Sequence, residues 1–220
     1  MIGIVSFLLL ALLLGFKHSY DADHVIAVSA ILRKVKSFGS ALKIGISWAI
    51  GHMITAAIIT AMLFYFRESF LSGLLSHFEK IVGVMLIALG LWSLKDAIFF
   101  HSHSHRHGHT AHSHVHSHFH KSKHSHLHKH MLGIGIVHGL ASNDELLVLL
   151  TASLGVATFG GIMLGIGFFS IGVVLGMAVF SAFFAFPLVK LHSDRVYRLF
   201  SFATGAISVA YGALSLVSAA

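Results

Sequence analysis

The chain has 220 residues, of which 56% are hydrophobic and only 10% are charged, and its formal net charge is +7. This composition is far from that of an ordinary soluble domain, although it could fit a single apolar core, so the length of the apolar runs must decide. The absence of cysteine excludes disulfides and thiolate metal sites. The basic excess does not indicate nucleic-acid binding, because it is concentrated in a few segments between apolar runs.

Six apolar runs account for most of the chain, and each is long enough for a helix to cross the hydrocarbon of a bilayer. They are 3–31, 41–66, 79–100, 131–157, 160–188 and 196–218. Because lipid offers no partners to backbone groups, runs of this kind form helices rather than open strands. The sequence therefore predicts an all-α integral membrane protein with about six transmembrane helices.

The basic residues between the runs predict the orientation of the chain. Eleven Lys and Arg residues lie in the segments that follow the first, third and fifth runs or at the edge of the next run, whereas the other side has only Arg67 and Lys80. By the positive-inside rule, the side with the larger number is cytoplasmic. We therefore expect a multi-pass protein of the cell inner membrane with both termini outside and the long segment 101–130 in the cytoplasm.

The two halves of the chain resemble each other at an offset of 120 to 122 residues. Glycine and small apolar residues recur by chance in membrane helices, but polar positions match as well, since His18 aligns with His138 and Asp23 with Asn143. Gly51 aligns with Gly172, and Gly83 and Gly90 align with Gly205 and Gly212. With three spans in each half, the sequence predicts two inverted three-helix repeats, 1–100 and 131–220.

Ionisable side chains at membrane depth are costly and usually functional. The expected first, second and fourth spans carry them, together with one amide: Lys17, His18, Asp21, Asp23, His24, His52, His138, Asn143, Asp144 and Glu145. Imidazole and carboxylate ligands suit divalent first-row metal ions such as nickel, cobalt, zinc and iron. The sequence therefore predicts that all of these residues except Lys17 form a metal site. A proton relay uses the same groups and is the alternative.

Helical geometry leaves alternatives open for some of these residues. In a regular helix Asp21 lies beside both His18 and His24, whereas Asp23 points elsewhere, so all four converge only if the helix is distorted. Otherwise one acid serves structure, for example by pairing with Lys17, and the Asp144–Glu145 pair is another candidate partner for that lysine. His52 can also be read as a helix-packing histidine.

The segment 101–130 contains 14 of the 20 histidines, often in the alternation His-Ser-His. It has no apolar face to bury, so we expect a disordered cytoplasmic metal-binding tract. A storage buffer, a delivery route for the ion and a metal sensor all fit this composition.

The residues from His18 to His24 read His-x4-Asp-His, which resembles the signature of the nickel/cobalt transporter family. Gly51-His52 resembles the next motif of that family, and the His-rich segment is similar to that of the related nickel/cobalt efflux proteins. The resemblance implies a secondary permease for Ni²⁺ or Co²⁺ in which His18, Asp23 and His24, and also His52, are needed for transport. Two features depart from the family: residues 138–145 only loosely match its second acidic motif, and its long uptake members have more spans.

The leading hypothesis is a transporter of divalent nickel or cobalt, with uptake ahead of efflux. A metal efflux permease, a membrane metalloenzyme and a non-transporting accessory subunit or sensor are the alternatives. The chain contains no His-Glu-x-x-His and no Gly-x-Ser-x-Gly motif, so we expect no enzyme and no resident cofactor. The expected partners are the metal ion as cargo, the lipid bilayer and a cytoplasmic metallochaperone, with no nucleic acid; the sequence does not indicate an oligomeric state.

Overall fold

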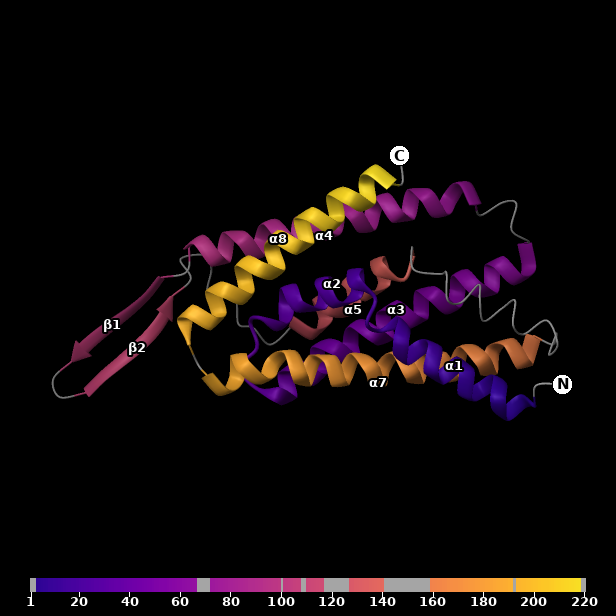
Figure 1. Ribbon diagram of the computed structural model, residues 1–220, viewed down its shortest axis with the longest axis horizontal. Helices are drawn as coiled ribbons and strands as arrows, with labels where there is room; N and C mark the ends of the chain where they lie inside the picture. The colour runs from indigo at the N-terminus through magenta and orange to yellow at the C-terminus, as the bar shows by residue number, and fades with distance from the viewer. Residues whose placement is uncertain are drawn as a thin grey trace.

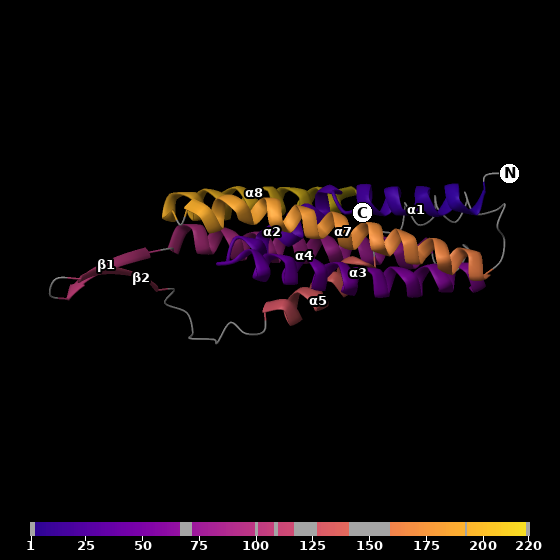
Figure 2. The same cartoon turned by 90° about the horizontal axis from the view of Figure 1, so that it is seen from below.

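The computed structural model describes residues 3–66, 72–99, 101–107, 110–116, 127–140, 159–191 and 193–218, and these form seven helices and one pair of strands. The helices are α1 (Ile4–His18), α2 (Ala22–Leu32), α3 (Phe38–Phe66), α4 (Ser72–Phe99), α5 (Leu127–His138), α7 (Phe159–Leu191) and α8 (Asp194–Ser218). They form an elongated bundle with the N-terminus near one end and a strand hairpin leaving the other (Figures 1 and 2). Within it, α1 packs on α7, α5 on α3, and α4 on α8.

Four helices are long and apolar enough to cross a membrane: α3, α4, α7 and α8. The pair formed by α1 and α2 adds a fifth candidate span, which is bent by 55°. The chain is thus a multi-pass helical membrane protein. The expected count of six spans is not reached among the described residues, because the expected span 131–157 is described only as far as residue 140, through α5.

The first apolar run is a broken helix rather than a continuous one. The backbone of Asp21 is extended, with φ −62° and ψ 146°, and it precedes α2 as its N-cap. Hydrogen bonds from the Tyr20 and Asp21 N–H groups to the Lys17 and His18 carbonyls close a tight turn after α1. The break therefore falls within the His-x4-Asp-His segment, which is the distortion that convergence of its side chains requires.

Helices α4 and α8 run antiparallel and touch through small residues. A Cβ atom on Gly90 would lie 2.8 Å from the Gly205 carbonyl oxygen, and one on Gly83 would lie 3.1 Å from that of Gly212. The Ser208 hydroxyl donates to the Leu86 carbonyl oxygen at 2.6 Å. Small residues let helix backbones approach closely where no water drives association, so these glycines fix the α4–α8 contact.

An ion-pair cluster joins the end of α2 to α4 and α8. The Arg33 side chain is 1% exposed, and its Nη1 lies 2.8 Å from Asp96 Oδ2 on α4. The Lys34 ammonium lies 2.6 Å from the same oxygen, and Arg33 Nη1 donates to the Tyr197 hydroxyl on α8 at 3.0 Å. In the sequence, Arg33 and Lys34 count only toward the basic excess that predicts the topology; in the structure they anchor the helix that carries His24.

The structure describes two stretches of the His-rich segment as strands. Two strands, β1 (His101–His107) and β2 (Thr110–His116), pair as an antiparallel hairpin directly after α4 (Figure 1). The register places His101 opposite His116, His103 opposite His114 and His105 opposite His112. The alternation of His and Ser, which has no apolar face, thus follows the two-residue period of a strand.

Candidate metal centre

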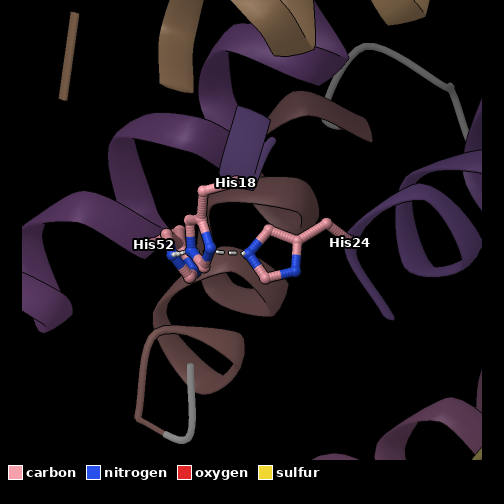
Figure 3. Close-up of side chains that lie close together, drawn as sticks. All are labelled: His18, His24 and His52. Atoms are coloured by element: carbon pink, nitrogen blue, oxygen red, sulfur yellow. Dashed lines mark hydrogen bonds between the residues drawn. The ribbon is translucent and has the colours of Figure 1, made fainter. Parts of the chain in front are cut away.

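Three histidines from three helices meet at the break between α1 and α2 (Figure 3). His18 ends α1, His24 lies in the first turn of α2, and His52 lies in the middle of α3. The Nε2 atom of His18 lies 3.1 Å from that of His24 and 3.3 Å from that of His52. All three side chains are at most 2% exposed, so the sequence-distant His52 belongs to the same buried cluster as the motif histidines.

Carboxylates determine which nitrogens of this cluster carry protons. His18 Nδ1 lies 2.8 Å from Asp21 Oδ2, and His24 Nδ1 lies 2.7 Å from Asp23 Oδ1. An ionised carboxylate only accepts hydrogen bonds, so both Nδ1 atoms must donate. In the neutral rings the two Nε2 atoms are then unprotonated, and their lone pairs face each other at 3.1 Å. Such a pair is stable only with a proton or a cation between the two nitrogens.

The spacing of these nitrogens fits a bound divalent ion. Imidazole nitrogens bind such ions at about 2.1 Å, which puts two ligands about 3.4 Å apart on a tetrahedral ion and about 3.0 Å apart at right angles. The observed separations of 3.1 and 3.3 Å lie in this interval. Histidine ligands oriented by carboxylates through Nδ1 are also the usual outer arrangement of metal sites. The donor set therefore suits a divalent first-row metal.

A second group of potential ligands adjoins the first and shares His24 with it. It consists of Asp23, His24 and His138, whose ligand atoms lie within 4.8 Å of one another. His138 Nε2 lies 2.9 Å from Asp23 Oδ2, so this one carboxylate bridges α2 and α5. His138 is completely buried, and its Nδ1 has no hydrogen-bond partner in the described part of the chain.

The structure brings together five of the nine residues expected to bind metal: His18, Asp23, His24, His52 and His138. Asp21 lies at the margin, where its other oxygen is 3.3 Å from Lys17 Nζ. This pairing with Lys17 is the structural role that helical geometry leaves open for one of the two acids. Asn143, Asp144 and Glu145 lie outside the described residues, as does their suggested pairing with Lys17.

Aromatic residues around the cluster were not singled out from the sequence. The Trp48 ring stacks on His52 with centroids 5.0 Å apart and an interplanar angle of 14°. It also meets the edge of His24 at 4.8 Å. The signal that could have revealed it is the spacing of four residues between Trp48 and His52, which places both on one helix face. A buried tryptophan in a membrane helix is otherwise common enough to be overlooked.

Comparison with known proteins identifies a relative over nearly the whole chain. The urease accessory protein UreH of Bacillus sp. (strain TB-90) is 31% identical over 212 residues, which cover 96% of this chain and 90% of that protein. No family model and no solved structure matches the chain. This relative is named as a urease accessory protein, whereas the His-x4-Asp-His motif resembles the signature of the nickel/cobalt transporters. The chain belongs to the family of the urease accessory protein UreH.

Proposed function

We propose that this protein is a membrane permease for a divalent transition-metal ion, with nickel as its first substrate. The observation that carries the proposal is the convergence of three buried imidazole Nε2 atoms, two of them oriented by carboxylates, inside a helical membrane protein. Ligands buried at membrane depth mark ion pathways. An ion that sheds its water there finds nitrogen ligands in replacement.

The choice of nickel rests on the relative. That protein is named as an accessory protein of urease, and this name implies the handling of nickel ions and a link to urease maturation. An accessory protein with several membrane-capable helices serves such an enzyme most directly by supplying its metal. The same name argues for a non-catalytic role rather than for a membrane metalloenzyme. Cobalt remains the second candidate cargo, because the donor set suits both ions.

An alternating-access mechanism by two inverted halves is part of the proposal. The helix contacts support it, because the offset that aligns the two halves converts one close helix contact into another. A Cβ atom on Gly15 would overlap the carbonyl oxygen of Phe169, and one on Gly135 would overlap that of Trp48. The offset maps Gly15 to Gly135 and Trp48 to Phe169, so the packing of α1 on α7 repeats that of α5 on α3. Substrate sites at the interface of inverted repeats are typical of transporters.

The experiment is flux of Ni²⁺ into liposomes that contain the purified chain and an entrapped nickel-sensitive dye. His18→Ala removes the nitrogen that faces both other histidines. Loss of an outer partner alone costs about 10–100-fold in metal affinity, so loss of this ligand should cost more and abolish saturable flux. His77→Ala, which alters an exposed histidine of α4 outside the cluster, is the matched control and should transport like the parent. Equal flux by His18→Ala and the parent would refute the site.

Uptake is the proposed direction, and efflux is the competing one. In cells, expression of an uptake permease raises accumulation of radiolabelled nickel, whereas an efflux permease lowers it. The His-rich hairpin next to α4 is compatible with either direction, since it can receive or supply ions on the side predicted to be cytoplasmic.

A further inference from the structure

Two fully buried aromatic residues, Trp48 and Phe169, lie against the histidine cluster from different helices. The Trp48 ring from α3 covers His52 and His24, with ring centroids 5.0 and 4.8 Å apart. The Phe169 ring from α7 lies 5.4 Å from the His18 ring. Both aromatic side chains are 0% exposed, so the two apolar rings are part of the wall that separates the cluster from its surroundings.

These two residues occupy corresponding positions in the two halves of the chain. They are 121 residues apart, the same separation as Gly51 and Gly172 in the alignment of the halves. Their backbones have corresponding contacts as well, since α1 approaches the Phe169 carbonyl at Gly15 and α5 approaches the Trp48 carbonyl at Gly135. Each aromatic residue therefore belongs to a helix pair, α3 with α5 or α7 with α1, that is tightly joined at that point.

The two residues lie on opposite sides of His52 along the bundle, because α3 and α7 run antiparallel, with Phe38 packed against Phe186. Helix α3 begins near the end from which the hairpin leaves, and Trp48 precedes His52 on it, so Trp48 lies on the hairpin side of His52 (Figure 1). Helix α7 runs in the opposite direction and reaches the hairpin end at Leu191. Phe169 lies in the first half of α7, away from that end.

We propose that Trp48 and Phe169 are the two gates of the ion site, one contributed by each half, and that each closes the route to one end of the protein. The proposal rests on the proposed transport function. A metal ion that has lost its water must be enclosed before it can be passed on, and an apolar ring excludes water without competing as a ligand. Movement of α3 with α5 would withdraw Trp48 together with His52 while Phe169 stays closed, and movement of α7 with α1 would withdraw Phe169 together with His18 while Trp48 stays closed.

The test separates ion binding from ion movement. In Trp92→Phe protein, Trp48 is the single tryptophan, since the chain has only two. Titration with Co²⁺ or Ni²⁺ should then quench its fluorescence, because both metals quench at short range and the Trp48 ring lies 5.0 Å from His52. Flux is measured in liposomes for Trp48→Leu and Phe169→Leu, which keep apolar bulk but lose the flat ring. The conservative variants Trp48→Phe and Phe169→Tyr are measured beside them, and Phe183→Leu, which removes a ring of α7 that is 81% exposed, is the control away from the cluster.

Binding of nickel, measured by calorimetry, should be unchanged in both Leu variants, because no ligand is altered. Flux in the Leu variants should no longer saturate with nickel concentration, and at high nickel it should exceed the flux of the parent by about tenfold. The reason is that, with one gate permanently open, a continuous path forms whenever the other gate opens. The aromatic replacements should restore the plateau. Leu variants that bind and transport like the parent, or that lose binding and flux together, would overturn the gating proposal. A parent protein that binds no nickel would instead overturn the proposed function itself.

Discussion

At the scale of single residues, two carboxylates have the same task, one in the helix break and one in the first turn of α2. Asp21 accepts from His18 Nδ1 and Asp23 accepts from His24 Nδ1, at 2.8 and 2.7 Å. Each thereby turns an Nε2 lone pair toward the centre of the cluster. Asp23 also contacts His138, which ties α2 to α5. This geometry gives Asp23 a role in orienting His24, and that role does not require Asp23 to bind the ion directly.

Replacing Asp23 with Asn should weaken metal binding without abolishing it. The amide oxygen can still accept from His24 Nδ1, but the negative charge and the second acceptor toward His138 are lost. Loss of such an outer partner costs about 10–100-fold in affinity, and calorimetric titration of Ni²⁺ into detergent-solubilised protein would measure it. Asp194→Asn, at the start of α8 and far along the chain, is the control. Complete loss of binding in Asp23→Asn would show that this carboxylate is a ligand itself.

At the scale of helices, close backbone contact decides which pairs act as units. Helices α4 and α8 meet at Gly90 and Gly205, and α2 is held to both by Arg33, whose side chain reaches Asp96 and Tyr197. On one side of the molecule, α4 and α8 thus pack through glycines, and the ion-pair cluster of Arg33 joins both of them to α2. A buried charge that loses its partner is uncompensated, which is costly. Because a shift of α2 would separate Arg33 from Asp96, we expect this cluster to hold the orientation of α2.

The glycine contact predicts opposite outcomes for two similar substitutions. Gly90→Ala adds a Cβ 2.8 Å from the Gly205 carbonyl oxygen, so the α4–α8 contact must open and the protein should lose stability. Gly167→Ala, inside α7, meets nothing within 4 Å. It should be neutral or stabilising, by up to about 1 kcal/mol from helix propensity. Thermal unfolding in detergent gives both values, and equal midpoints for the two variants would contradict the packing of α4 on α8.

At the scale of the whole molecule, the ion site and the His-rich hairpin are separate. The cluster ligands come from α1, α2 and α3, whereas β1 and β2 lie beyond the end of α4 (Figure 1). An isolated two-stranded hairpin is marginally stable in water, and this one carries histidines at facing register positions. We therefore expect the His-rich segment to bind ions independently of the buried histidine cluster.

Replacement of residues 101–126 by a Gly/Ser linker should leave saturable Ni²⁺ flux in liposomes intact at high nickel. The buried ligands stay in place, so the apparent Kd of the transport site should not change, while the number of ions bound per chain should fall. Equilibrium dialysis with metal analysis counts the ions, and the dye assay measures flux. Loss of flux together with the extra ions would place the hairpin within the transport path.

The sequence by itself determined the class of the protein and singled out most residues of its candidate centre. Apolar runs of membrane length dictate helices because lipid cannot satisfy backbone groups, and His18, Asp23, His24 and His52 stand out because ionisable groups at depth are costly. Only the tertiary structure decided that the first run breaks at Ser19–Asp21, that Asp21 serves Lys17 and His18, and that Trp48 and Phe169 cover the cluster. The reason is physical: local spacing fixes neighbours within one helix, but which residues of different helices meet depends on how closely the backbones pack, and on where a helix bends.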